Sequence, residues 1–240
     1  MAIDPLVQRL RREANPLFCH QPNTVLGLSG GGDSMALLHL LLASGLLPRE
    51  RLTVAHFNHN LRADAHMDVQ FTREIARKLQ LNYTTTTWTA PHGAGNLPAL
   101  ARAARYGFLV ETARRVAAPL LATAHHMDDQ AETFLERLAR GSGARGLGAM
   151  APSRPLTPEV TLVRPLLCFR HQELLHWLTR REIPWMEDPS NHNPHFLRAR
   201  IRGQLLPCLQ AALHRDPTPQ LAETARRMAH THDALEWSLD

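Results

Sequence analysis

The chain has 240 residues, of which 44% are hydrophobic and 20% charged, and its formal net charge is +5. This composition is typical of a soluble globular protein, and the length suits one α/β domain with some additional helix. No window approaches the roughly 18 consecutive apolar residues of a membrane span, and the N-terminus does not show the apolar run of an export signal. We therefore expect a cytoplasmic protein with no membrane partner.

Cysteine and lysine usage argues against several kinds of site. Cys19, Cys168 and Cys208 are odd in number, far apart and form no CxxC pair, which disfavours a disulfide framework, a structural zinc site and a sulfur-transfer motif. Lys78 is the only lysine and no glycine precedes it, so the sequence contains no Walker-type phosphate loop. The other basic residues are arginines, whose planar fork suits phosphate and carboxylate groups.

Expected strands and helices alternate along the first part of the chain. A short apolar run at 25–28 precedes a glycine-rich turn, and apolar residues then recur at helical spacing from Met35. Further strands are expected at 52–57, 83–87 and 119–124, and further helices at 64–79, 97–116 and 127–140. Four such repeats predict an α/β fold with a parallel sheet and helices on both faces.

The second part of the chain is expected to be mainly helical. The stretch 141–143 and the proline-rich segment 151–158 break the alternation, and helices are expected at 171–181, at about 194–213, and from Thr218 to the end. We therefore predict a parallel-sheet domain over 1–150, a helical annex of the same unit over 151–216, and a C-terminal helix or linker over 217–240.

The six residues that follow the first strand form a candidate phosphate site. Glycines at this junction let backbone N–H groups approach a phosphate, and the helix N-terminus adds unpaired donors. Asp33 is placed to hold a magnesium ion that bridges phosphate oxygens, since Mg²⁺ prefers oxygen ligands. With the two serine hydroxyls as further donors, the predicted site comprises Ser29, Gly30, Gly31, Gly32, Asp33 and Ser34.

Two other interpretations of this turn are weaker. In the first, it is a structural β-α turn with Asp33 as an ordinary N-cap, which three glycines flanked by two serines make less favoured. In the second, it binds a dinucleotide, but the motif G-x-G-x-x-G is absent and the second strand ends in HFNH, without the acidic residue that a ribose requires.

The motif SGGGDS after a first strand resembles the PP-loop of the N-type ATP pyrophosphatases. That resemblance implies that ATP is cleaved between its α- and β-phosphates and that an adenylated intermediate forms on a carbonyl or amide oxygen. A nucleophile then displaces the adenylate. The loop alone leaves the identity of this nucleophile open.

The helix expected at 127–140 carries a row of acids. His125, Asp129, Glu132 and Glu136 fall on one stripe, and apolar residues fall on another. Because this helix directly follows a parallel strand, we expect the acidic stripe to face the same crevice as the phosphate loop. Two neighbouring carboxylates are stabilised by an ammonium group, so the pattern indicates a cationic substrate.

Two alternatives exist for the acidic row. It could be a solvated face that pairs with Arg137 and Arg140, or His125, His126 and Asp129 could hold a metal. No HExxH motif or second ligand cluster supports the metal.

Longer motifs resemble the tRNA(Ile)-lysidine synthase family over about residues 22–210. In chain order they are HFNHNLR, GNLPALARAARYGFL, HHMDDQAETFLERLARGSGARGLGAM, VRPLLCFRHQELL and WMEDPSNHNPHFLRARIRGQLLPCL. By that resemblance, ATP with Mg²⁺ adenylates the 2-carbonyl oxygen of the wobble cytidine in an isoleucine tRNA with a CAU anticodon. The side-chain amine of free lysine then displaces AMP.

The same resemblance implies roles for residues outside the loop. Asp129 and Glu132 correspond to the acids that hold the lysine substrate, and Arg105 corresponds to a basic residue beside the reacting phosphate or the substrate carboxylate. We therefore expect Asp33, Arg105, Asp129 and Glu132 to be catalytic, and His56 to bind the nucleotide. The alternative for Arg105 is a surface arginine on the long helix.

Arg198 and Arg202 lie four residues apart and are expected to share a helix face. They could bind ATP phosphate or the tRNA backbone, and the alternative is a solvated face that pairs with nearby acids. Trp185, Pro189 and Asn191 are expected in a loop over the crevice, where Trp185 could stack a base, although a buried core position is favoured.

The sequence departs from the family pattern at two positions and in its length. The family commonly has aspartate at Asn193 and asparagine at Ala199, so we expect different side-chain contacts in this loop. Full-length relatives usually continue into C-terminal domains that grip the tRNA acceptor stem, so the chain is either a short natural form or a fragment.

Three rival functions fit the sequence less well. A tRNA thiolase needs reactive cysteines or an iron–sulfur cluster, which the three dispersed cysteines do not offer. An ATP-dependent amide synthetase would release AMP without tRNA, and a nucleotide-sensing or RNA-binding module would have no turnover. The oligomeric state and the general base are left open.

Overall fold

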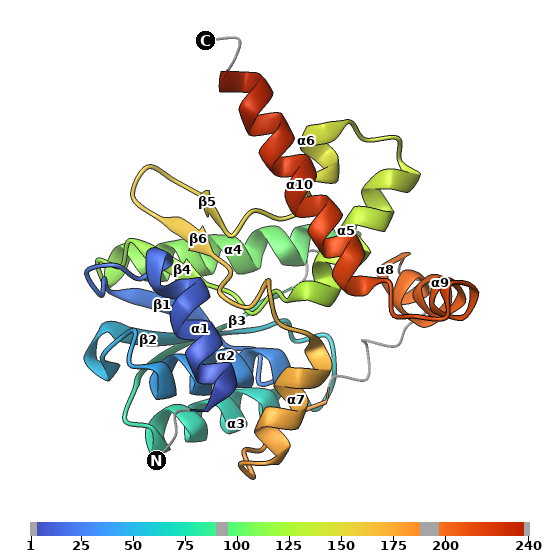
Figure 1. The fold of residues 1–240 in the computed structure, drawn as a ribbon. Helices are drawn as coiled ribbons and strands as arrows, with labels where there is room; N and C mark the ends of the chain where they lie inside the picture. Colours follow the sequence, from blue (N-terminus) through green and yellow to red (C-terminus); the bar gives the residue numbers. More distant parts are fainter. Residues whose placement is uncertain (1–3, 90–95, 188–196, 238–240) are drawn as a thin grey trace. The chain divides into compact units, whose positions relative to one another are not determined.

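The computed structural model describes residues 4–89, 96–187 and 197–237, which form two compact units (Figure 1). Unit 1 contains the chain up to Ala124, Ser153–Pro165 and Leu174–Met186. Unit 2 contains His125–Pro152, Leu166–Glu173 and the chain from Glu187 onward. The units are interleaved in sequence, and the consecutive division at 150 and 216 stays a prediction about domains. Pro189, Asn191 and Asn193 lie outside the described residues.

Unit 1 is built on a six-stranded sheet with the order β3-β2-β1-β4-β6-β5. All neighbouring strands are parallel except β5 and β6, which are antiparallel. The chain runs from β1 outward to β3 on one side and then returns to β4 on the other, so the topological switch point lies between β1 and β4. The strands are β1 (Thr24–Gly27), β2 (Leu52–Asn58), β3 (Asn82–Thr87), β4 (Leu120–Ala122), β5 (Ser153–Pro155) and β6 (Thr161–Val163).

Helices cover both faces of this sheet, as Figure 1 shows with α1 and α2 in front of it and α4 behind. Residues of α4 pack with residues of β1, β2, β4 and β6 in a core that includes Val25, Ala55, Leu109, Leu121 and Leu162. Covered on both faces, β2 is buried along its whole length. The helical segments of unit 1 are α1 (Pro5–Ala14), η1 (Asn15–Leu17), α2 (Gly32–Ser44), η2 (Arg49–Arg51), α3 (Ala65–Lys78) and α4 (Leu97–Arg115); α7 (His171–Thr179) begins in unit 2 and ends in unit 1.

Every regular element among the described residues of unit 2 is a helix. The helix α10 packs against α5 and α6, and it comes so close that a Cβ added to Gly148 would lie 3.1 Å from Ala229. Gln130 of α5 exchanges two hydrogen bonds of 2.8 Å with the backbone of Met150. Its elements are α5 (Met127–Ala139), α6 (Ala144–Leu147), α8 (Leu197–Arg200), the π-helical turn η4 (Ile201–Leu205), α9 (Leu206–Leu213) and α10 (Thr218–Trp237).

The α/β fold class and the four predicted strands are confirmed, and the boundaries of the helices predicted at 64–79, 97–116, 127–140 and 171–181 agree within two residues. The helix predicted from Met35 begins at Gly32, and the described part of the helix predicted at about 194–213 is divided into α8, the π-helical turn η4 and α9. The strands β5 and β6 were not predicted, because segment 151–158 was expected only to interrupt the pattern. Each has three residues, too few for a period of two to stand out, and β5 ends in Pro155, which an edge strand tolerates. No helix in the described ranges is both long and apolar enough to cross a membrane.

Asp4 connects the first helix of unit 1 to the segment at the end of α7. It is the N-cap of α1 and accepts a hydrogen bond of 2.9 Å from the backbone N–H of Leu6. Its carboxylate also accepts 3.2 Å and 2.7 Å hydrogen bonds from the side chains of Trp177 and Arg181. Burial raises the pKa of Asp4, but the hydrogen bonds from Arg181 and the two backbone amides lower it further, so the net shift is downward.

We expect Asp4→Ala to destabilise the protein by about 1–3 kcal/mol, because the helix cap and the indole and guanidinium bonds are lost together. Urea denaturation at neutral pH measures the change. Glu13→Ala is the matched control, since Glu13 is exposed on α1 and pairs with the neighbouring Arg12. Equal effects of the two substitutions would contradict this role of Asp4.

Candidate functional site

The loop after β1 is closed by its two serines. The hydroxyl oxygens of Ser29 and Ser34 lie 3.0 Å apart, and Ser34 Oγ accepts a 3.2 Å hydrogen bond from the Ser29 N–H. Ser34 Oγ also donates a 2.9 Å hydrogen bond to the carbonyl oxygen of Gly31. The backbone N–H of Gly31 in turn donates a 3.2 Å hydrogen bond to Ser29 Oγ. The structure thus brings the predicted loop residues together in one tight turn at the end of β1.

Two glycines of this turn are required by its geometry. Gly30 has φ +92°, a conformation that residues with a Cβ rarely adopt, and an added Cβ would lie 3.3 Å from Thr72. A Cβ on Gly32 would lie 2.3 Å from the side chain of Leu175 and 3.5 Å from that of Trp185. The Gly30 carbonyl accepts a 2.9 Å hydrogen bond from Met186, so the segment after α7 fixes the loop.

Asp33 lies in the first turn of α2, but it is not the cap of that helix. The N-cap is Gly31, which has no side chain to bond the first amides, so the interpretation of Asp33 as an ordinary N-cap is wrong. The carboxylate of Asp33 belongs to the same turn as the hydroxyls of Ser29 and Ser34. These oxygen groups are the type of ligand that Mg²⁺ prefers, so the residues fit the predicted ion.

His56 stands at the end of β2 and bonds the strand that precedes the loop. Its side chain is buried, and Nδ1 lies 2.9 Å from the carbonyl oxygen of Leu28. Burial lowers the pKa of His56, while the bond to Leu28 and the charge of Asp68 act in the opposite direction. A neutral ring that donates from Nδ1 to Leu28 leaves Nε2 as an acceptor, and Nε2 has no hydrogen-bond partner among the described residues. Nucleotide binding by His56 stays a prediction.

Arg105 and Trp185 are both partly exposed. Arg105 on α4 is only partly exposed, with Nε buried and its guanidinium carbon 5.3 Å from the ring centre of Tyr106. Its catalytic role and the alternative of a surface arginine both stay predictions. Trp185 is half-buried rather than part of the core, and its ring lies beside Gly32 of the loop.

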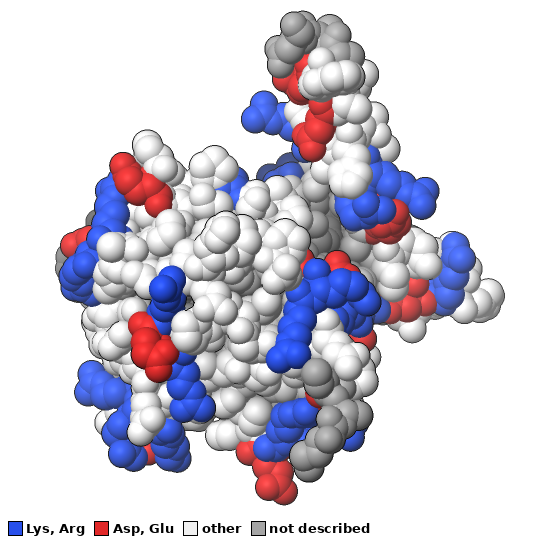
Figure 2. All heavy atoms as spheres, turned by 60° about the vertical axis from the view of Figure 1, so that its left-hand side comes forward, with Lys and Arg blue, Asp and Glu red and all other residues white. Residues whose placement is uncertain are grey.

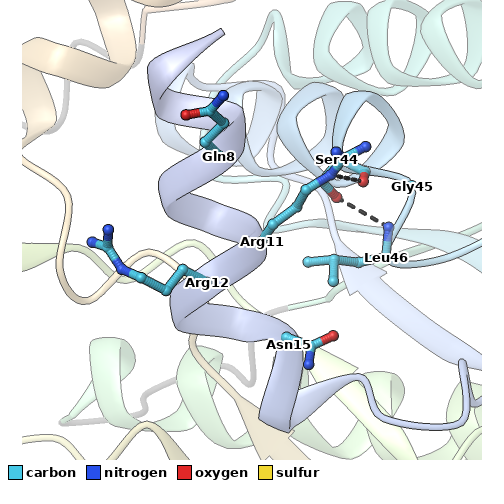
Figure 3. Close-up of a pocket in the computed structure, with 7 residues that line it drawn as sticks. All are labelled: Gln8, Arg11, Arg12, Asn15, Ser44, Gly45 and Leu46. Atoms are coloured by element: carbon cyan, nitrogen blue, oxygen red, sulfur yellow. Dashed lines mark hydrogen bonds between the residues drawn. The ribbon is translucent and has the colours of Figure 1, made fainter. Parts of the chain in front are cut away.

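A hollow of about 620 Å³ in unit 1 lies at the other end of α2 (Figure 3). Arg11 reaches across it and donates a 2.5 Å hydrogen bond to the carbonyl of Ser44. The 13 residues of α2 span roughly 20 Å, so this hollow is separate from the glycine loop. It is lined by Gln8, Arg11, Arg12, Asn15, Ser44, Gly45 and Leu46.

In unit 2, the predicted acids lie on one face of α5, but not in solvent. The side chain of Glu132 exposes 0% of its surface and that of Asp129 exposes 15%. Asp129 accepts a 3.0 Å hydrogen bond from the backbone N–H of His126 and so caps its own helix. Burial raises the pKa of Glu132, although the hydrogen bond and charge of Arg202 act to lower it.

Arg198 and Arg202 pair with this acidic face. Arg202 Nε donates a 2.6 Å hydrogen bond to Glu132, and a terminal guanidinium nitrogen lies 4.0 Å from Asp129. Arg198 donates a 3.1 Å hydrogen bond to the hydroxyl of Thr133 and lies 3.6 Å from Glu136. The two arginines therefore pair with acids of their own unit, as expected from the alternative in which they pair with nearby acids. Phosphate binding by Arg198 and Arg202 stays a prediction.

The alternative of a solvated acidic row that pairs with Arg137 and Arg140 is wrong in two respects. Glu132 is buried, and Arg137 donates to the carbonyl oxygens of Gly146 at 2.7 Å and Ala149 at 2.8 Å. Only Arg140 pairs as that interpretation expects, at 2.7 Å from Glu136.

Sequence reasoning missed a second charged cluster of unit 2, centred on Arg170. Its guanidinium bonds Asp128 at 2.9 Å and also pairs with Asp216, which precedes α10. The backbone N–H of His171 donates a further 2.8 Å bond to Asp128. Burial raises the pKa of Asp128, but the bonds from His126, Arg170 and His171 outweigh it, so the pKa is well below its usual value. The sequence shows two adjacent acids at 128–129 and two adjacent basic residues at 170–171. Neither pair by itself indicates that Asp128 and Arg170 contact each other.

A family model described as a PP-loop domain matches residues 5–209. The match covers most of the chain and includes the glycine loop, so the chain belongs to the PP-loop domain family.

Within that family, the chain is similar to tRNA(Ile)-lysidine synthases. It is 40% identical over 234 residues to that of Ruegeria pomeroyi, covering 97% of this chain and 54% of the relative. It is 40% identical over 232 residues to that of Bradyrhizobium diazoefficiens, covering 94% and 63%. The chain therefore spans between about half and two thirds of the length of these relatives.

A solved structure supports the fold. The U34-tRNA thiolase NcsA from Methanococcus maripaludis, determined with its [4Fe-4S] cluster, superposes with a TM-score of 0.76. The alignment covers 93% of this chain and 77% of that one, at 16% sequence identity. At this identity, the likeness concerns the fold alone.

We expect Gly30→Ala to weaken ATP binding by about tenfold or more and to destabilise the protein by about 1–2 kcal/mol, because alanine is strained at this φ. Calorimetric titration with ATP and urea denaturation measure the two effects. Gly107→Ala on α4 is the control, since an added Cβ there meets no atom within 4 Å. That change should leave ATP binding intact and stabilise the helix by about 0.5–1 kcal/mol. A Gly30→Ala variant with normal ATP affinity would contradict the site.

We expect Arg170→Met to destabilise the protein by about 1–3 kcal/mol at pH 7, because partly buried Asp128 and Asp216 lose their cation. Both carboxyl groups have lowered pKa values, so their stabilisation is present above the ordinary value near 3.8 and is lost as the pH falls below it. The difference in unfolding free energy between the two proteins, measured by urea denaturation, should therefore be largest at pH 7 and only partly reduced at about pH 3. Arg226→Met, which removes an exposed pair with Glu223, should have little effect at either pH.

Proposed function

We propose that this chain carries the catalytic part of a tRNA(Ile)-lysidine synthase, an ATP-dependent ligase that modifies tRNA. The observation that carries the proposal is its 40% identity to a tRNA(Ile)-lysidine synthase over 97% of the chain. The geometry of the glycine loop and of the acids of α5 supports it, because ATP-dependent ligation of an amino acid needs a phosphate site and an ammonium site.

The reaction has two steps. The 2-carbonyl oxygen of the wobble cytidine, in an isoleucine tRNA with a CAU anticodon, attacks the α-phosphorus of ATP and pyrophosphate leaves. The side-chain amine of free lysine then attacks carbon 2, the carbon–oxygen bond breaks, AMP departs and the amine loses a proton. Adenylation is needed because a carbonyl oxygen is a poor leaving group, whereas AMP is a good one.

In the first step, the loop binds the triphosphate. The N-terminal amides of α2 have no side-chain cap and so suit a phosphate, with Ser29 and Ser34 as hydroxyl donors. Asp33 would hold Mg²⁺, which neutralises charge on the departing pyrophosphate when it is bound. Arg105 is proposed to stabilise the reacting phosphate or the carboxylate of lysine by its fixed positive charge.

In the second step, Asp129 and Glu132 bind lysine through an ammonium group. Carboxylates hold an ammonium in its charged form, whereas the attacking amine must be neutral. The acids therefore suit the α-ammonium of lysine and leave the side-chain amine to react. We predict that these acids and the glycine loop of unit 1 face one crevice.

The tRNA partner is supported by the names of the relatives and by the arginine-rich composition. Figure 2 shows arginine side chains dispersed over the visible face, with acidic side chains beside many of them. Each exposed arginine that contacts a tRNA phosphate would add to a salt-dependent affinity. Contact of Arg198 and Arg202 with tRNA or ATP phosphate is part of the proposal.

One assay tests this function: the protein is incubated with ATP, magnesium, labelled lysine and the CAU-anticodon tRNA, and label is measured in the tRNA. We expect label only with a cytidine at the wobble position. AMP release without tRNA would instead support a small-molecule amide synthetase, and absence of turnover would support a binding module.

In the same assay, we expect Asp129→Asn and Glu132→Gln each to raise the KM for lysine by about tenfold or more, with a smaller change for ATP, because each removes an anion that binds the ammonium. Glu136→Gln is the matched control on the same face of α5, where it pairs with Arg140 and should leave the KM for lysine nearly unchanged. Similar KM values in all three variants would show that the acids of α5 do not bind lysine.

A further inference from the structure

The acid proposed to bind the substrate already has a cationic partner in the same unit. Arg202 Nε donates a 2.6 Å hydrogen bond to Oε1 of Glu132, and another nitrogen of this guanidinium lies 4.0 Å from Asp129. An ammonium that binds between the two acids would need the position of the guanidinium. Arg202 and the substrate cation are therefore competitors by geometry.

The exposure of the two side chains indicates which of them moves. Glu132 exposes 0% of its side chain, whereas Arg202 exposes 50%. A cation that arrives from solvent can bond Oε1 of Glu132 only by replacing a group that now covers it, and Arg202 is the group bonded there. The buried carboxylate stays in place, since it needs a cation at all times.

The pairing of Glu132 is also incomplete. Its second oxygen, Oε2, is buried and has no hydrogen-bond partner among the described residues. An ammonium group has three donors on one small centre and can serve both oxygens of a carboxylate. The site thus offers an incoming ammonium one more acceptor than Arg202 uses.

The backbone around Arg202 is irregular. Arg202 lies in the π-helical turn η4, a geometry that is rare and frequent at functional sites. The next residue is Gly203, where an added Cβ would meet no atom within 4 Å. The turn therefore has open space on the side of Gly203 where a side chain would stand.

We propose that Arg202 is an internal competitor of the substrate lysine: its guanidinium pairs with Glu132 until the lysine ammonium displaces it. The inference rests on the proposed function, since it takes Glu132 as part of the lysine site. Displacement also releases the guanidinium for the phosphate contact expected from the sequence. The cost of displacement lowers the affinity for lysine, and only a cation that satisfies both acids compensates for it.

Calorimetric titration of the whole chain with lysine, without ATP or tRNA, tests the competition. We expect Arg202→Ala to bind lysine with a Kd about tenfold lower than the unsubstituted protein. Arg140→Ala is the matched control, because it removes an arginine that pairs with Glu136 of α5 but not with Glu132. Lysine affinity that is equal or weaker in Arg202→Ala overturns the proposal.

A second measurement does not depend on lysine ligation. Ethylammonium chloride, compared with sodium chloride at the same ionic strength, should raise the Tm of Arg202→Ala more than that of the unsubstituted protein. The double variant Arg202→Ala/Glu132→Gln should show no such difference between the salts. Equal shifts in all three proteins overturn the proposal, and Arg202→Gln replaces Arg202→Ala if the latter does not fold.

The two hypotheses fail in different ways. If ethylammonium stabilises Arg202→Ala selectively but the unsubstituted protein never labels tRNA, the competition at Glu132 stands and the proposed function is wrong. If tRNA is labelled but Arg202→Ala gains neither lysine affinity nor ethylammonium stabilisation, the function stands and Arg202 is not a competitor.

Discussion

Neutralisation of buried carboxylates by arginine is the interaction on which unit 2 depends. Glu132 on α5 has no exposed surface and is bonded by Arg202, which lies 70 residues further along the chain. Arg170 joins Asp128 of α5 to Asp216, at the start of α10. A carboxylate placed in a protein interior without such a partner is strongly unfavourable, so these pairs select the packing in which each acid meets its cation.

The same interaction relates stability to function in this unit. A site that binds an ammonium needs anions that are partly desolvated, because water would otherwise weaken their attraction for the ligand. Desolvated anions destabilise the protein unless a cation is at hand, and Arg202 supplies that cation from an exposed position. Arg170, with only 23% of its side chain exposed, keeps the neighbouring Asp128 engaged and so leaves Glu132 and Asp129 as the acids that can exchange partners.

The glycine loop of unit 1 differs from this acidic site, because it suits an anion. The loop uses backbone amides and neutral hydroxyls, and the conformation of Gly30 and the lack of a side chain at Gly32 bring the chain close to its neighbours. This part is shared in fold with a tRNA thiolase at a TM-score of 0.76. A shared fold does not fix a reaction, which depends on the side chains at the site.

The sequence by itself determined the alternating strands and helices, the glycine turn and the acidic stripe, because each depends on neighbours within a few residues. It could not determine β5 and β6, since strands of three residues acquire their structure from pairing: β6 pairs with β4, more than 30 residues earlier, and β5 pairs in turn with β6. The spacing of Arg198 and Arg202 was visible, but the choice between phosphate and Glu132 was not. That choice depends on which helix faces pack together and how deeply the acid is buried, and only the tertiary structure decided both.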